Sequence, residues 1–375
     1  MDLVSPELRG VNLGSWLLLE RWMVPSLFEG LAATDETSFC AELGPAAAER
    51  LRAHWERWIT REDFAWIAER GLNAVRIPFG HWIFGPDYPY HRAYGANPHP
   101  FVDGGIDVLD RAMDWAAEFG LRVMLDLHAA PGCQNGFDNG GILNVCEWHT
   151  QAEYREHTLS VLERMARRYR DHPALYAIEC LNEPRWDVPT DYLKDFYTEA
   201  YARIRRHCPA ERVAVVVHDG FRSFREYVGF LQAPVFRNVM FDLHRYQCFD
   251  RRDIDSDIFA HMAKAGGEWR DEADAIITGL GLPAICGEWS LGLDLRVVSL
   301  WAEGPFNHAL EHMDAFEQDV ANRGYAAAQL LTFEKYLGWF FWSYKTETTP
   351  AWCFRDCVER GWLPSQYGWL ASEFG

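Results

Sequence analysis

Two glutamates stand directly after hydrophobic runs that read as buried strands. Glu183 follows the run at 175–181, and Glu288 follows the run at 283–286. A carboxylate at the end of an apolar strand is costly to bury unless it is paired or functional. Two facing carboxylates can cleave a glycosidic bond, because one protonates the leaving oxygen while the other attacks the anomeric carbon or activates water. The alternative is that nearby arginines merely neutralise both acids.

The neighbours of the two glutamates suggest a role for each. Asn182 could bind a sugar 2-hydroxyl, a contact that strengthens in the transition state. Arg76, at the end of another expected strand, could pair with Glu288, lower its pKa and keep it an anionic nucleophile. Tyr246 could donate a hydrogen bond to the same carboxylate. Glu183 would then have the raised pKa and carry the proton.

Two histidines are weaker candidates for the site than the glutamates. His128 and His244 end matching Asp-Leu-His triplets, and we expect both to bind substrate, although a lone histidine at a strand end is more often structural. The pattern His308-Ala309-Leu310-Glu311-His312 formally matches a metalloprotease motif, but it lies in a stretch expected to be an outer helix. We therefore predict no metal and no other cofactor.

Short apolar runs alternate with amphipathic stretches along the whole chain. The expected strands are Gly10–Leu13, Ala74–Pro78, Arg122–His128, Leu175–Leu181, Val213–His218, Val239–His244, Ala284–Glu288 and Trp339–Ser343. The expected helices include Asp103–Phe119, Gln151–Arg170, Asp191–His207, Asp257–Thr278 and His308–Arg323, with Asp191 and Asp257 as N-caps and Gly71 and Gly120 closing helices.

Eight alternating strands with no linker predict an α/β fold, a single (β/α)8 TIM barrel that forms one catalytic domain over residues 1–375. The polar residues follow the strands, and the carboxyl ends of the strands carry the active site in this fold. The segments around 79–103 and 129–149 would be elaborated loops at that face. An open doubly wound sheet is the second possibility, but no Gly-x-Gly-x-x-Gly turn follows the early strands.

Composition excludes some partners. With 36 basic and 55 acidic residues, the chain has a net charge of −19 and would repel nucleic acid and anionic membranes. No apolar stretch is long enough to span a bilayer, so we expect no membrane insertion. The first residues do not resemble a signal peptide, which predicts a cytoplasmic protein as written, or a secreted one if a leader was removed. Oligomeric state is unknown at this stage. Of the nine cysteines, Cys180 and Cys286 are expected to be reduced core residues.

Several motifs resemble glycoside hydrolase family 5 of the large retaining clan. They are Val75-Arg76-Ile77-Pro78, Asn182-Glu183-Pro184, His244-Arg245-Tyr246 and Gly287-Glu288-Trp289. Longer stretches resemble the fungal exo-β-1,3-glucanases of that family: Arg9–Gly14 running into Leu19-Glu20, Asp126–Gly132, Gln134–Asn139 and Trp342–Glu347. The similarity spans nearly the whole chain.

The resemblance implies a retaining hydrolase that releases β-linked glucose from the non-reducing ends of β-1,3-glucan or its oligosaccharides, with Glu183 as acid/base and Glu288 as nucleophile. The residues implied to line the terminal-glucose subsite are Arg76, His128, Asn182, His244, Tyr246 and Trp342. Those implied to close that pocket are Glu20, Asp138 and Asn139, with Phe137 and Phe249 as an aromatic clamp at its entrance.

One residue departs from the fungal pattern, because Cys133 stands where those enzymes usually have serine. The fungal enzymes are also secreted and disulfide-bonded. Related branches of the family act on glycolipids or on flavonoid and aryl glycosides, and these substrates are alternatives here. A carbohydrate-binding barrel that has lost catalysis is a further alternative, which the two intact glutamates disfavour.

Overall fold

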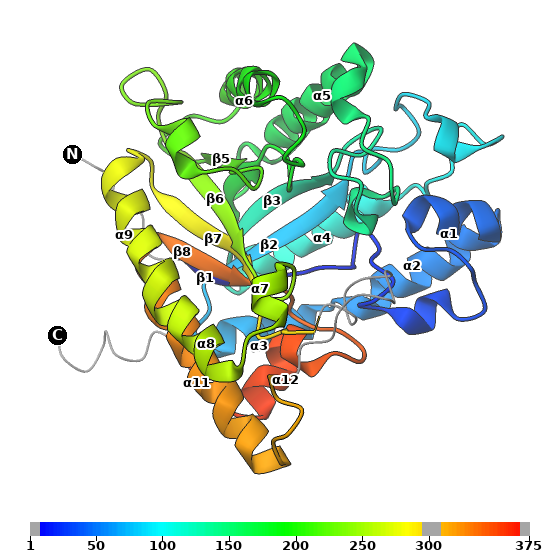
Figure 1. Ribbon diagram of the computed structural model, residues 1–375. Coiled ribbons are helices and arrows are strands. Elements are labelled where there is room, and N and C mark those ends of the chain that lie inside the picture. Colours follow the sequence, from blue (N-terminus) through cyan, green and yellow to red (C-terminus); the bar gives the residue numbers. More distant parts are fainter. Residues whose placement is uncertain (1–7, 295–308, 368–375) are drawn as a thin grey trace.

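Each of the eight apolar runs forms a strand; in Ala214–His218, for example, three consecutive valines favour an extended backbone. The computed structural model describes residues 8–294 and 309–367, and its strands close into one parallel barrel in sequence order, with helices around it (Figure 1). The predicted TIM-barrel fold is therefore confirmed. The strands are β1 Leu8–Asn12, β2 Ala74–Gly80, β3 Arg122–Ala129, β4 Leu175–Glu179, β5 Ala214–His218, β6 Val239–Arg245, β7 Ala284–Trp289 and β8 Gly338–Phe341.

Helices connect successive strands, and most of their predicted ends are confirmed. Asp257 caps α8 by accepting the N–H of Ala260, as predicted, whereas Asp191 lies inside the first turn of α6, after Pro189. Gly71 and Gly120 close α3 and α4 with positive φ angles of 75° and 70°, as predicted. The helices are α1 Glu36–Leu43, α2 Ala46–Trp58, α3 Arg61–Glu69, α4 Gly105–Glu118, α5 Ala152–Tyr169, α6 Thr190–Arg205, α7 Arg251–Ile254, α8 Ile258–Ala263, α9 Trp269–Gly279, α11 Ala315–Phe333 and α12 Phe354–Glu359.

Two expected helices have different bounds in the structure. The stretch expected at 257–278 is divided into α8 and α9 by a π-helical segment, Lys264–Glu268, which contains two adjacent glycines that weaken an α-helix. The helix expected from 308 begins only at Ala315, because Asp314 caps it there by accepting the N–H of Glu317. Residues 309–312 form turns, so the described part of the His-x-x-Glu-His pattern is not helical, and His308 lies outside the described residues.

The barrel interior is built in layers because alternate residues of a strand point to the same face. One layer is apolar and separate from the outer core: Leu8, Ala74, Met124, Ala177, Ala214, Val216, Met240, Ile285 and Phe340. Two positions further along the strands, the inward residues become polar: Arg76, Asp126, Glu179, His218 and Asp242. The intervening residues, such as Val75 and Leu125, pack outward against the helices in the main core. An apolar floor therefore supports a polar layer at the carboxyl ends of the strands.

All nine cysteines lie in the described residues and are free thiols, and Cys180 and Cys286 are buried, as predicted. Within the described residues, no helix combines the length and apolar character that crossing a bilayer requires.

Candidate active site

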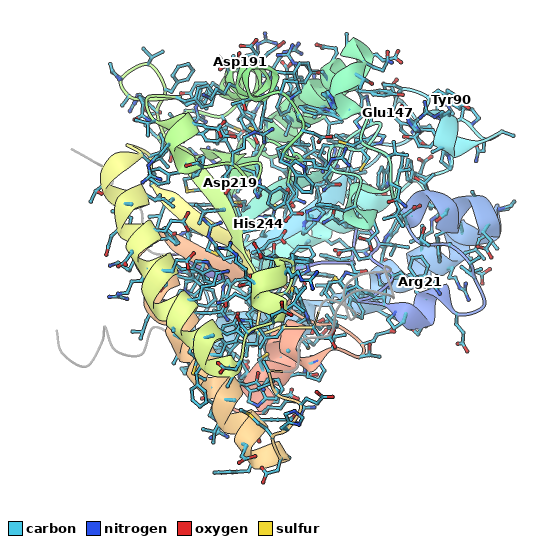
Figure 2. All side chains as sticks on the ribbon, viewed as in Figure 1. Arg21, Tyr90, Glu147, Asp191, Asp219 and His244 are labelled. Carbon is cyan, nitrogen blue, oxygen red and sulfur yellow. The ribbon has the colours of Figure 1, made fainter. Side chains whose placement is uncertain are left out.

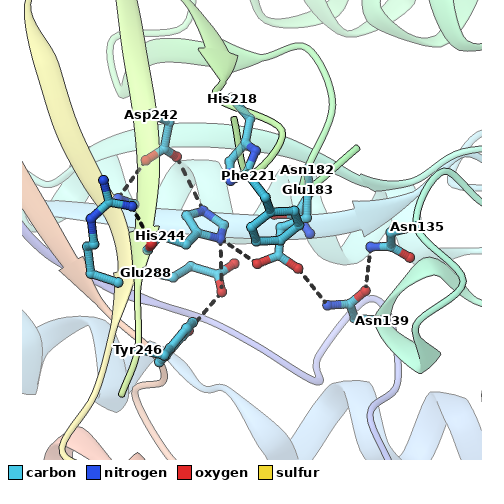
Figure 3. A network of polar contacts seen from close by, with 12 residues as sticks. Asn135, Asn139, Asn182, Glu183, His218, Phe221, Asp242, His244, Tyr246 and Glu288 are labelled. Atoms are coloured by element: carbon cyan, nitrogen blue, oxygen red, sulfur yellow. Dashed lines mark hydrogen bonds and ion pairs between the residues drawn. The ribbon is translucent and has the colours of Figure 1, made fainter. Parts of the chain in front are cut away.

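The two predicted glutamates lie together at the carboxyl ends of β4 and β7, and His244 joins them. Its Nδ1 lies 2.7 Å from Oε1 of Glu183 and 3.4 Å from Oε2 of Glu288 (Figure 3). Carboxyl groups about 5–5.5 Å apart are typical of retaining glycosidases, and a gap of about 6.5–9.5 Å is typical of inverting ones. Because one ring nitrogen contacts both carboxylates, the geometry favours the closer spacing.

A β-bulge aims Glu288 into the barrel. The pairing of β6 with β7 shifts after Leu243–Cys286, so His244 pairs with Glu288 and Gly287 is skipped. Gly287 donates its N–H to Oδ1 of Asp242 at 2.6 Å, and a Cβ there would lie 2.0 Å from Oδ2 of the same carboxylate. Only glycine allows this approach, and the glutamate after it consequently faces the catalytic centre.

Glu288 accepts hydrogen bonds from two predicted partners. Arg76 donates from Nη1 to Oε1 at 2.9 Å, and the Tyr246 hydroxyl donates to Oε2 at 2.8 Å. Glu288 is only 4% exposed, so these contacts lie in a largely water-free site. The predicted ion pair and the predicted tyrosine contact are both confirmed, and they fix both oxygens of this carboxylate.

Glu183 is held by the loop that follows β4. Its φ of 44° lies in the left-handed region, which a non-glycine residue occupies only when the surroundings impose it, and such strain gathers at active sites. Besides His244, the carboxylate accepts a 3.3 Å hydrogen bond from Nδ2 of Asn139, whose own amide oxygen accepts from Asn135 (Figure 3). Asn139 thus reaches the catalytic acid as well as the expected sugar pocket.

Arg76 is fully buried and contacts more acids than the sequence suggested. Its guanidinium pairs with Glu179 at 2.7 Å and with Asp126 at 3.1 Å, in addition to Glu288. It also donates to the amide oxygen of Asn12. Asp126 and Glu179 were missed as site residues, although their positions two residues before a strand end placed them on the inward face.

His128, Asn182 and Trp342 come together as predicted. His128 contacts Oδ2 of Asp126 through Nδ1 at 2.5 Å, and burial lowers its pKa to about 3, so the ring is neutral and Nε2 is an acceptor. The Asn182 amide lies 3.3 Å from that Nε2, while its oxygen accepts from Arg76 at 2.8 Å. This orientation leaves the second amide proton of Asn182 for a ligand. The indole of Trp342 stacks on the His128 ring at 5.3 Å.

The expected order of the two glutamate pKa values is wrong in this structure. Burial raises the pKa of Glu288 to about 7, against the pull of His244 and Arg76, and the charge of Glu183 adds to the rise. Burial also acts on Glu183, but the hydrogen bond and charge of His244 lower the pKa of Glu183 below its usual range. The charged His244 ring therefore favours the Glu183 anion in the free enzyme.

Glu20 and Asp138 form a second pair of acids near the catalytic centre. Glu20 is 4% exposed and accepts a 2.9 Å hydrogen bond from Trp22 at Oε2, but its Oε1 has no partner. Oδ2 of Asp138 is likewise buried without a partner, and burial raises its pKa to about 7. Burial and the charge of Asp138 also raise the pKa of Glu20. Buried polar atoms normally have partners, so these oxygens are suited to accept from ligand hydroxyls.

The two predicted clamp residues each lie against another aromatic ring. Phe137 meets Phe221 at 6.4 Å between centroids, and Phe249, 55% exposed, meets Tyr246 at 5.7 Å. Tyr246 is the residue that donates to Glu288, so Phe249 lies beside the catalytic centre. The clamp itself stays a prediction.

Among the residues that the structure describes, two sets of side chains have the spacing for a cation: Glu183, His218 and His244, and Glu179, Asp242 and His244. Both include His244, whose Nδ1 contacts Glu183 and Glu288 and whose Nε2 lies 3.6 Å from Oδ2 of Asp242, so a cation in either set would share this ring with the contacts already described. Figure 2 shows that His244, which both sets share, lies near the centre of the barrel. The expectation of a reaction without a metal stays a prediction.

Comparison with known proteins identifies the family. The cellulase model, glycosyl hydrolase family 5, matches residues 40–347, which include Glu183 and Glu288. The chain belongs to glycosyl hydrolase family 5. This family 5 enzyme is similar to a glucan 1,3-beta-glucosidase of Blumeria graminis, with 36% identity over 97% of this chain and 88% of the relative. A probable glucan 1,3-beta-glucosidase A of Emericella nidulans is 37% identical over 96% of this chain and 91% of its own.

Solved structures share the fold of this family 5 enzyme. A rutinosidase from Aspergillus niger superposes with a TM-score of 0.76 at 19% identity, covering 96% of this chain and 99% of the other. At that identity the likeness establishes the barrel architecture and nothing about the substrate.

Proposed function

We propose that this protein is a retaining, exo-acting hydrolase that releases glucose from the non-reducing ends of β-1,3-glucan or its oligosaccharides. The observation that carries the proposal is the contact of His244 with both Glu183 and Glu288, while Arg76 and Tyr246 fix the second carboxylate. The relatives named glucan 1,3-beta-glucosidases support the substrate class.

Arg76 and His244 suggest which glutamate is the nucleophile and which is the acid/base. Arg76 stays protonated at all working pH values, so its charge stabilises the Glu288 anion permanently. Burial opposes the charge on His244, but Glu288, Asp242 and Glu183 raise the pKa of His244 well above its usual value, so the ring is protonated near neutral pH. A substrate that separates this charged ring from Glu183 would raise the pKa of Glu183, which could then act first as acid and, once deprotonated, as base. Glu288 is therefore the nucleophile and Glu183 the acid/base.

The reaction has two displacements. In the first, a Glu288 oxygen bonds to the anomeric carbon while Glu183 gives its proton to the glycosidic oxygen, which leaves. In the second, water attacks the same carbon, Glu183 takes the proton from water, and the bond to Glu288 breaks. The amide proton of Asn182 that is not used by His128 is available to the sugar 2-hydroxyl.

The exo action would follow if Glu20 and Asp138 end the sugar pocket, as the resemblance to the fungal exo-β-1,3-glucanases implies. The unpartnered oxygens of these acids and the amide of Asn139 can bind the outer hydroxyls of a terminal glucose. Hydrogen bonds of this kind favour a chain end, because its terminal glucose brings free hydroxyls to otherwise unpartnered buried oxygens. A longer chain could not continue past them.

Two measurements test the proposal. Proton NMR of the first product from a laminari-oligosaccharide should show the β-anomer, and an initial α-anomer would contradict retention. Product analysis of laminarin should show glucose alone, with the polymer shortening slowly. Early release of mixed oligosaccharides would contradict the exo assignment, and preference for gentiobiose, cello-oligosaccharides, glucosylceramide or a rutinoside would contradict the substrate.

A further inference from the structure

An exposed tryptophan stands at the mouth of the site, three residues after Glu183. Trp186 is 62% exposed, an unusual position for a side chain of its size. Its ring lies 6.2 Å from Phe221, which lies 6.4 Å from Phe137 and 5.5 Å from His218. Phe221 thus joins Trp186 and Phe137 in a row of three rings and links that row to His218.

The backbone under Trp186 is held in place by side chains. Arg222 donates from Nη2 to the carbonyl oxygens of Arg185 and Trp186, each at 3.2 Å, and also to that of Val188. Arg185 in turn pairs with Asp187 at 2.6 Å. A ring presented by a fixed loop binds a ligand without a large ordering cost.

Phe221 is strained in a way that points to binding. Its φ of 59° is in the left-handed region, which is unfavourable for an aromatic residue. Asp219 holds this conformation by accepting the Phe221 N–H at 2.7 Å, and the Tyr227 hydroxyl donates to the Asp219 carbonyl at 2.9 Å. The ring is nevertheless 42% exposed, and it meets the His218 ring at 5.5 Å. Strain of this kind, with no burial of the ring in return, is typical of a functional position.

We propose that Trp186, with Phe221 behind it, binds the sugar units of the leaving chain beyond the unit nearest the cleaved bond. The C–H face of a pyranose packs on an aromatic face, and a neutral glucan chain needs no charged partner there. The occupant is the substrate itself, because the row of rings is continuous with His218, whose ring meets that of His244 at 4.4 Å. This role rests on the proposed function and deepens it, since it predicts a preference for longer chains.

The experiment compares Trp186→Ala and Trp186→Phe with the unmodified enzyme on an aryl β-glucoside and on laminari-oligosaccharides of two to five units. Trp186→Ala should lower kcat/KM for the tetraose and pentaose by about three- to tenfold, mainly through KM, the size of one lost stacking contact. The loss should shrink as the chain shortens, and Trp186→Phe should restore most of it. Phe316→Ala, which removes a 73% exposed ring on α11, is the matched control and should change neither substrate class.

The outcomes separate the two claims. An equal loss on every substrate would show that Trp186 supports the Glu183 loop instead of a sugar, and no loss on any would show that the ring binds nothing; either result overturns the subsite alone. If the unmodified enzyme hydrolyses the aryl glucoside but none of the laminari-oligosaccharides, the proposed function fails, and the subsite fails with it.

Discussion

Glu36 offers a test of the electrostatics that does not touch the catalytic residues. It lies in the first turn of α1, is 1% exposed, and accepts a 2.9 Å hydrogen bond from the N–H of Leu19. Burial raises the pKa of Glu36 from its usual value near 4.5 to about 8, although the Leu19 bond works against the rise. Near neutrality this acid is therefore protonated in the folded chain and ionised in the unfolded one.

The substitution Glu36→Gln keeps the size and an acceptor oxygen but cannot ionise. Between pH 4.5 and 8 the folded wild-type protein binds a proton that the unfolded chain releases, so its stability falls as pH rises. The slope for one group is about 1.4 kcal/mol per pH unit at most. Relative to wild type, the variant should gain up to about 4 kcal/mol in unfolding free energy between pH 5 and pH 8.

The assay is urea unfolding followed by tryptophan fluorescence at pH 5, 6, 7 and 8. At pH 5 the two proteins should differ little, and the difference should widen steadily towards pH 8. Glu69→Gln, which removes an exposed acid at the end of α3, is the control and should give a profile parallel to wild type. If Glu36→Gln also runs parallel to wild type, Glu36 ionises normally and burial does not govern its charge.

The catalytic and pocket residues lead to three further predictions. Glu288→Gln should leave the circular dichroism spectrum unchanged and lower turnover of every substrate by several orders of magnitude; retained turnover would exclude it as the nucleophile. Glu183→Gln should harm substrates with poor leaving groups far more than activated aryl glucosides, since a good leaving group needs little acid help, and equal losses would show that the roles are misassigned. Asp138→Ala should cost about 1.5–3 kcal/mol of charged hydrogen bonding to the terminal sugar, seen as about a tenfold to hundredfold fall in kcat/KM, and an unchanged value would place the sugar elsewhere.

The barrel could be predicted because its strands carry their own signal. Segments such as Ala214–His218 are mostly apolar and bury both faces, as parallel strands between helices do. The helix ends were harder, because they depend on single contacts. Asp191 and Asp314 look alike in sequence, yet only Asp314 reaches a backbone N–H, since Thr190 after Pro189 already begins α6.

Glu183 and Glu288 could be predicted as candidates because each follows an apolar run at a strand end. Their supporting acids were missed, since Glu179 and Asp126 read as ordinary strand residues until Arg76 is placed between them. Arg76 is 103 residues from Glu179 in the chain, and only closure of the barrel brings the two together. A contact between distant strands leaves no local pattern in the sequence. The sequence shows only the two-residue period that places Arg76 and Glu179 on the inward face of the barrel.

The order of the glutamate pKa values was mispredicted for a related reason. From the sequence, Arg76 was expected to pair with Glu288 and lower its pKa, which would have kept that acid ionised. In the folded protein, burial raises the pKa of Glu288 by more than His244 and Arg76 lower it, and the charge of Glu183 adds to the rise. His244 meanwhile lies closer to Glu183 than to Glu288, by 2.7 Å against 3.4 Å, and favours the Glu183 anion while it is charged. A sugar that separates the charged His244 ring from Glu183 would raise the pKa of Glu183, which would suit it to the acid role proposed for it.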